Sequence, residues 1–192
     1  LIGQLRYGEN PHQLATFYSD KNPAPDSLAA TKTIQGKALS FNNIADSDAA
    51  LECVKQFSSP ACVIVKHLNP CGVATSKNTL NAYQKAFATD PTSAFGGIIA
   101  FNQSLDAKTA KEIIKNQFVE VIIASKITAN ALPILAQKKK LRVLEFNPPD
   151  SKKAENQIDF KKVTGGLLVQ TLDSKVLDKN SLNIVTKIKP SP

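Results

Sequence analysis

A Lys–His pair near the middle of the chain has the residue types and the setting for catalysis. Lys66 and His67 lie in the segment VIVKHLNPCGVA at 63–74, directly after an apolar run that suits a strand buried on both faces. An imidazole can take a proton near neutral pH, and an ammonium stabilises negative charge developing on an oxygen, so neither group needs a metal. The pattern favours catalysis at the carboxyl end of a rigid strand. The alternative is a surface lysine beside a structurally hydrogen-bonded histidine.

The same segment matches a zinc signature only in part. The stretch from His67 to Cys71 resembles the H-x-E and P-C-x-x-C motifs of zinc-dependent nucleobase deaminases. Asn69 stands where the proton-shuttling carboxylate is needed, and Ala74 stands where the second thiolate is needed. The sequence contains only one other histidine, His12. We therefore expect no metal, and a zinc-dependent deaminase is the alternative hypothesis.

Five further positions carry groups suited to binding. In RYGENPHQ at 6–13, Arg6 offers a bidentate fork for phosphate or carboxylate, and Tyr7 offers a ring face or a hydroxyl. Gly96 lies in SAFGG at 93–97, where a ligand could approach the backbone, although a plain turn needs the same residues. Asn43 lies at a predicted helix entrance. Glu120 lies inside an apolar strand, where a carboxylate needs a partner.

Helix and strand patterns alternate along the chain and must position these groups. Asp46 is the predicted cap of the first helix, and residues 69–72 are a predicted polar turn after the Lys–His pair. The predicted helices are 47–57, 79–88, 106–116 and 130–137, and the predicted strands are 15–18, 61–65, 98–101, 119–124 and 142–146. A further strand pair is predicted at 159–163 and 166–170. The alternation indicates an α/β fold with a largely parallel sheet flanked by helices.

Composition limits the class of protein. A chain of 192 residues with 42% apolar content suits one globular domain, and no apolar stretch approaches the roughly 20 residues that a membrane span needs. Three cysteines without a CxxC spacing favour reduced thiols and a cytoplasmic location. Because the chain starts at Leu1 and contains no Met, we expect it to be a fragment of a longer protein.

The net charge of +8 comes mainly from lysine-rich segments. They are 138–142, 152–162 and 175–189. A single-strand nucleic-acid groove would place aromatic residues among the charges, and these segments contain few. We interpret them as solvated faces and expect no nucleic acid and no membrane as partner. A positive field that attracts anions is the alternative interpretation, and a basic nucleic-acid-binding module is a competing hypothesis.

Five sequence blocks in order resemble a single family. The blocks are RYGENPHQ at 6–13, LSFNNIADSDAA at 39–50, VKHLNPCGVA at 65–74, DPTSAFGGIIAFN at 90–102 and FVEVIIA at 118–124. They resemble the transformylase part of the bifunctional purine biosynthesis proteins, which couple aminoimidazole carboxamide ribonucleotide (AICAR) formyltransferase to inosinate (IMP) cyclohydrolase. The resemblance continues through GGLLVQ at 165–170.

The resemblance implies a fold and a domain context. The fold would be α/β with three layers, α-β-α, and a mixed sheet similar to that of cytidine deaminase but without zinc. Residues 1–192 would be the first subdomain of the transformylase domain, with a cyclohydrolase domain before Leu1 and a second transformylase subdomain after Pro192. Full-length members form homodimers whose active site draws on that second subdomain and on the other subunit. We therefore expect this fragment to be inactive alone.

The resemblance also implies a reaction. A formyl group would pass from the cosubstrate 10-formyltetrahydrofolate to the 5-amino group of AICAR on the route to IMP. His67 would remove a proton from the attacking amine, while Lys66 would stabilise the developing oxyanion or assist protonation of the folate leaving group. Substrate contacts of the family match Arg6, Tyr7 and Gly96, with Asn43 as an addition and with Glu120 where some members have Asp. A non-catalytic folate- or nucleotide-binding remnant is a further alternative.

Overall fold

The chain divides into two compact units, residues Leu1–Asp150 and Ser151–Pro192. The computed structural model describes residues 1–148, 158–173, 178 and 181–189. The lysine-rich segments at 152–162 and 175–189, which were interpreted as solvated faces, lie partly outside the described residues. Residues 190–192 lie entirely outside them.

A six-stranded mixed sheet forms the centre of the first unit. Its strands are β3 (Lys32–Gln35), β4 (Ala61–Lys66), β5 (Asn69–Thr75), β6 (Gly97–Phe101), β7 (Val119–Ala124) and β8 (Arg142–Glu145), in the order β3-β8-β7-β6-β4-β5. β7 runs parallel to β6 and β8, and the other three neighbouring pairs are antiparallel. The mixed sheet is confirmed, and the expectation of a largely parallel sheet is wrong. The difference arises because β4 continues into a hairpin instead of a crossover helix.

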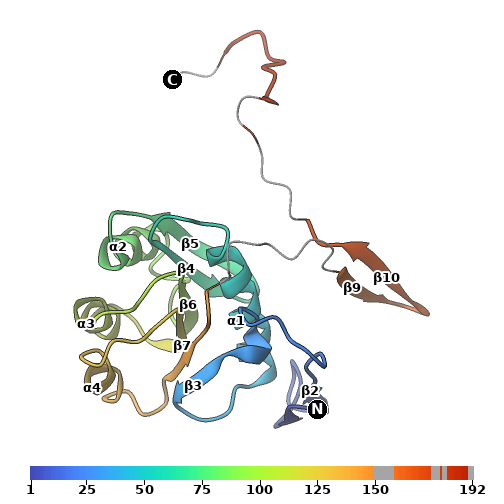
Figure 1. Cartoon of the computed structure of the whole chain (residues 1–192), viewed down its shortest axis with the longest axis horizontal. Helices are drawn as coiled ribbons and strands as arrows, with labels where there is room; N and C mark the ends of the chain where they lie inside the picture. Colours follow the sequence, from blue (N-terminus) through green and yellow to red (C-terminus); the bar gives the residue numbers. More distant parts are fainter. Residues whose placement is uncertain (149–157, 174–177, 179–180, 190–192) are drawn as a thin grey trace. The chain divides into compact units, whose positions relative to one another are not determined.

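Helices cover both faces of this sheet, which gives three layers (Figure 1). The helices are α1 (Phe41–Val54), α2 (Thr79–Thr89), α3 (Ala107–Asn116) and α4 (Leu132–Leu135). α2, α3 and α4 pack on one face, and α1 packs on the other. The predicted three-layer α/β fold is therefore confirmed.

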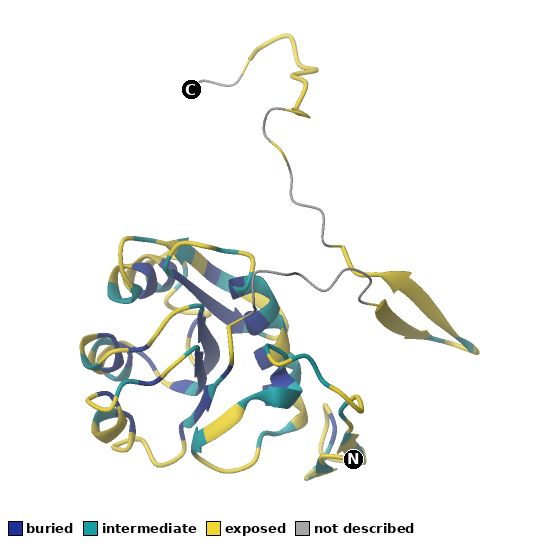
Figure 2. Cartoon of the chain, in the orientation of Figure 1, coloured by how far each residue is buried: buried dark blue, intermediate teal, exposed yellow. Residues whose placement is uncertain are grey.

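β4 is buried on both faces, as its apolar run predicts (Figure 2). Cys62 and Ile64 pack in the core beneath α2 and α3, while Val63 and Val65 pack against the α1 side. Full burial of each aliphatic side chain contributes about 1.5–3 kcal/mol. The strand that carries Lys66 is thus held firmly from both sides.

α1 starts earlier than predicted. Its N-cap is Ser40, whose Oγ accepts a hydrogen bond from the Asn43 backbone N–H, while the Asn43 Oδ1 accepts from the Ser40 N–H, both at 3.2 Å. This reciprocal capping box satisfies two N–H groups at the helix start. Asp46, the predicted cap, lies in the second turn, so that prediction is wrong.

The boundaries of β7, α3 and α2 agree closely with prediction, whereas α4 is shorter than predicted. β7 matches to the residue, α3 begins after the N-cap Asp106, and α2 ends one residue later than expected. α4 is limited to four residues of the eight predicted. The three cysteines are free, and Cys62 is fully buried, which raises the pKa of its thiol well above the usual range.

Two small hairpins and one short helix complete the described structure. β1 (Gly3–Leu5) pairs with β2 (Ala15–Phe17), and the 3-10 helix η1 spans Leu28–Ala30. In the second unit, β9 (Ile158–Val163) pairs with β10 (Gly166–Thr171) as an antiparallel hairpin, as predicted. Gly165 has a φ of 75°, a value that the turn needs and glycine adopts without strain.

Candidate functional site

One edge of the six-stranded sheet gathers most of the predicted site residues. Lys66 is the last residue of β4 and His67 follows it directly, so the pair lies at the carboxyl end of the strand, as predicted. Because β4 is antiparallel to β6, and β6 and β7 are parallel, β6 and β7 begin at this edge. The groups that surround the pair therefore come from the amino ends of β6 and β7, and not from the carboxyl ends of parallel strands.

Lys66 is held against the glycine turn before β6. Its Nζ donates a hydrogen bond to the Gly96 carbonyl at 3.1 Å. Gly96 has a φ of 70°, and a Cβ added there would lie 3.2 Å from that Nζ. Glycine at this position therefore serves both the backbone conformation and the close approach of the ammonium.

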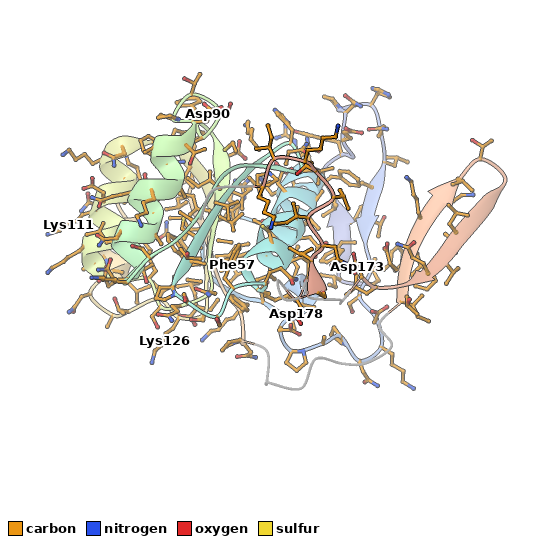
Figure 3. The ribbon with its side chains drawn as sticks, turned by 90° about the horizontal axis from the view of Figure 1, so that it is seen from above. Phe57, Asp90, Lys111, Lys126, Asp173 and Asp178 are labelled. Atoms are coloured by element: carbon orange, nitrogen blue, oxygen red, sulfur yellow. The ribbon has the colours of Figure 1, made fainter. Side chains whose placement is uncertain are left out.

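The turn that ends at Gly96 is ordered by its first residue. Asp90 accepts hydrogen bonds from the backbone N–H and the Oγ of Ser93, at 2.9 and 2.6 Å. These hydrogen bonds hold the pKa of the Asp90 carboxyl below its usual range. The Asp90 carboxylate thereby fixes the loop between α2 and β6, and Figure 3 labels it on this loop.

His67 lies in a two-residue hairpin turn between β4 and β5. His67 and Leu68 have φ values of 52° and 65°, both left-handed, as a type I′ turn requires. The His67 carbonyl accepts from Asn69 Nδ2 at 2.8 Å, and the Leu68 N–H donates to Asp46 Oδ1 at 2.8 Å. The exposed imidazole is thus carried by a short turn that is tied to α1.

This hairpin corrects the prediction for the residues that follow His67. Residues 69–72 were expected to form a polar turn, but Asn69 begins β5, which pairs with β4 in a register that shifts between Ile64 and Val65. β5 is an edge strand, where proline is tolerated because one side of the strand has no partner.

Asn43 and Glu120 form a second pair at the same edge. Asn43 Nδ2 donates to Glu120 Oε2 at 2.8 Å, and Asn43 is 4% exposed. Glu120 is the extra residue at a register shift between β6 and β7, which turns its side chain toward α1. The partner that a carboxylate in an apolar strand requires is therefore Asn43.

Arg6 and Tyr7 precede a compact loop next to the start of α1. The Arg6 guanidinium carbon lies 5.5 Å from the centroid of the Tyr7 ring, a cation–π distance. Gly8 and Gln13 close the loop through a 2.9 Å backbone hydrogen bond. Asn42 Nδ2 donates to the Glu9 carbonyl at 3.3 Å, which links the loop to α1.

The first half of α1 therefore contacts three parts of the site. Asn42 contacts the loop after Arg6 and Tyr7, Asn43 contacts Glu120, and Asp46 contacts the turn that carries His67. Sequence reasoning missed the role of Asp46, because a mid-helix acid carries no signal for its partner. The Ser-x-x-Asn spacing of the capping box was the one local signal for the position of Asn43.

The sequence of the chain matches a family model over nearly its full length. The AICARFT/IMPCHase bienzyme model matches residues 2–192. The chain belongs to this family. The resemblance drawn from the five sequence blocks is thereby confirmed, and the family is that of an enzyme with AICAR formyltransferase and IMP cyclohydrolase activities.

Solved structures similar to this AICARFT/IMPCHase chain include two forms of RibD from Acinetobacter baumannii. Form 1 has 15% identity and a TM-score of 0.43 over 54% of this chain and 35% of RibD. Form 2 has 15% identity and a TM-score of 0.36 over 52% of this chain and 33% of RibD. The match thus spans about a third of each RibD chain, and both scores are too low to carry an argument.

The described residues also bear on metal binding and on membrane insertion. Within that part of the chain, no group of three or more His, Cys, Asp or Glu side chains could hold a metal ion. In the same residues, every helix is too short or too polar to cross a membrane.

Proposed function

We propose that this chain carries the Lys–His half of a formyl-transfer site of AICAR formyltransferase. The observation that supports this most directly is the hydrogen bond from Lys66 Nζ to the Gly96 carbonyl, beside the turn that carries His67. Membership of the AICARFT/IMPCHase family supplies the reaction, which lies on the route to IMP. The cosubstrate 10-formyltetrahydrofolate supplies the formyl carbon.

His67 is the proposed general base. The 5-amino nitrogen of AICAR attacks the formyl carbon, the bond from that carbon to folate N10 breaks, and N10 takes up a proton. The amine is conjugated with its ring and is a poor nucleophile, so His67 assists by removing the proton that the new bond makes acidic. Its exposed position on a two-residue turn leaves the imidazole open to substrate.

Lys66 is the proposed electrostatic group. An ammonium has three N–H donors, and the Gly96 carbonyl takes one of them. Two donors remain for the oxyanion that develops at the formyl carbon, or for delivery of a proton toward the folate leaving group. The bond to Gly96 fixes the ammonium before substrate binds, which reduces the entropy cost of the step.

The remaining predicted residues are proposed to bind AICAR. Arg6 would hold an anionic group of the nucleotide, Tyr7 would pack beside it, and Gly96 would admit the substrate close to the backbone. Glu120 would accept from a substrate donor through its other carboxylate oxygen. Because both polar atoms of the Asn43 amide are engaged, we propose that Asn43 acts by positioning Glu120.

The complete site is proposed to need more than these 192 residues. We propose a cytoplasmic homodimer in which a second transformylase subdomain and the other subunit supply the missing contacts. The isolated chain should then show no turnover, and substantial formyl transfer by the 192-residue chain would contradict this expectation.

The decisive experiment uses the full-length protein that contains this sequence. We expect His67→Ala and Lys66→Ala each to lower kcat for formyl transfer at least about 100-fold, since general-base and oxyanion contributions are typically this large. Lys126→Ala is the matched control, because the exposed Lys126 follows the opposite end of β7 (Figure 3). Losses of only a few-fold in both variants would contradict the proposed roles.

A further inference from the structure

A lysine-lined groove opens at the same edge of the sheet as the candidate site. Its volume is about 610 Å³. Lining residues come from the end of α3, the start of β7 and the loop between α4 and β8, with Phe95 from the turn before Gly96. We call it the lysine groove, after the lining residues Lys115, Lys138, Lys139 and Lys140.

The charge of the lysine groove is one-sided. Its lining includes four lysines and neither Asp nor Glu. Across the part of the chain that the structure describes, the two salt bridges both involve Lys55, so none of these four ammonium groups pairs with a carboxylate there. Clustered like charges raise the local concentration of ions of the opposite sign. The groove therefore suits an anionic ligand.

The lysine groove adjoins the Lys66 site through Gly96. Phe118, which lines the groove, accepts a 2.8 Å hydrogen bond from the Gly96 N–H, and Gly96 in turn accepts from Lys66. The rings of Phe95 and Phe118 lie 5.5 Å apart, and both are about half exposed or more. An aromatic surface thus joins the lysines to the proposed catalytic pair.

The groove and the Asn43–Glu120 pair lie on different faces of the sheet. Glu120 turns toward α1, whereas the groove is lined by α3 and by the loop after α4, which cover the other face. Lys66 and Gly96 lie between them at the shared edge. Groups suited to binding therefore lie on both faces of the sheet near this edge.

We propose that the lysine groove binds the glutamate carboxylates of the formyl donor. This inference rests on the proposed function, which makes a folate the second substrate. Folate carries a flat, uncharged aromatic part and a glutamate tail with two carboxylates. The aromatic surface next to Gly96 suits the first, and the unpaired lysines farther along the groove suit the second.

The test compares ligands that differ only in the tail. In the full-length protein, we expect the variant K138Q/K139Q/K140Q to weaken binding of folic acid at least about tenfold at low salt, measured by calorimetry, because charge-assisted contacts are lost. Pteroic acid amide, which lacks glutamate and carries no carboxylate, should bind both proteins equally. The same variant should raise the KM for 10-formyltetrahydrofolate and leave kcat nearly unchanged.

A matched variant controls for net charge. K77Q/K108Q/K126Q removes the same charge from exposed lysines at the opposite edge of the sheet, and its folic acid affinity should equal that of the parent. Equal losses for folic acid and pteroic acid amide, or no loss for either, would overturn the groove assignment. A parent protein that binds folic acid through these lysines but transfers no formyl group would overturn the proposed function and leave the groove assignment intact.

Discussion

At the residue scale, the backbone of His67 shows how the fold positions a chemical group. A left-handed φ costs a non-glycine residue roughly 1 kcal/mol, and here two adjacent residues, His67 and Leu68, adopt it. The cost persists because β4 and β5 pair on both sides of the turn and because Asp46 binds the Leu68 N–H. A rigid, strained turn restricts the imidazole to a small region next to Lys66.

The Asn43–Glu120 pair gives a residue-scale prediction about positioning. Asn43→Asp keeps the acceptor that Ser40 needs but replaces the amide donor with a carboxylate oxygen facing Glu120. We expect a loss of about 1–3 kcal/mol in the free energy of unfolding, from the lost hydrogen bond and like-charge repulsion. Urea denaturation of the 192-residue chain measures this loss.

The double variant Asn43→Asp/Glu120→Gln separates structure from function. It restores one donor and one acceptor to the pair, so unfolding stability should recover. The KM for AICAR in the full-length protein should nevertheless be higher than that of the parent, because residue 120 no longer presents a carboxylate to the substrate. If stability and the KM for AICAR recover together, Glu120 has only a structural role.

At the scale of elements, the packing of β5 on α2 depends on Gly72. A Cβ at Gly72 would collide with the backbone carbonyl of Ala86 in α2. Backbone cannot move as easily as a side-chain end, so Gly72→Ala should lower the free energy of unfolding by about 1–3 kcal/mol. Gly3→Ala is the control, because nothing lies within 4 Å of its added Cβ. A Gly72→Ala chain with the urea midpoint of the parent would contradict this packing.

The elements that the sequence predicted well are those with a strong apolar pattern. β4 and β7 follow from runs of Val and Ile, and α3 follows from its Asp106 cap. β5 was missed because Pro70 and Gly72 disfavour strands, and only its edge position and contact with α2 make them acceptable. The two-residue turn was missed because His67 and Leu68 lack the Asn-Gly signal of such turns.

The structure brings most of the predicted site residues to one edge of the sheet, but the sequence did not predict their contacts. Lys66 beside Gly96 and Asn43 beside Glu120 join positions 30 and 77 residues apart. Such pairs depend on strand order, and strand order depends on the β4–β5 hairpin that local patterns did not reveal. The groove lysines illustrate the same limit: residues 138–140 are exposed, as interpreted, but only the fold shows that the end of α3 and Phe118 line a groove with them.

At the scale of the whole molecule, the first unit has a core of its own. Both core clusters consist of residues between Leu28 and Phe146, on the two faces of one sheet. No residue of the second unit that the structure describes belongs to either cluster. In that unit, the paired strands β9 and β10 form a two-stranded sheet, which is marginally stable in water by itself.

We therefore expect residues 1–150 to fold without residues 151–192. The shortened chain should unfold in a single cooperative urea transition, with a midpoint close to that of the 192-residue chain, because its apolar burial is complete within the unit. Far-ultraviolet circular dichroism and tyrosine fluorescence, which Tyr83 in the core supports, should report the same transition. Two separate transitions, or loss of cooperativity, would mean that the second unit completes the core.

Gly72→Ala, introduced into the shortened chain, should lower its urea midpoint as it does in the 192-residue chain, since β5 and α2 both lie within the first unit.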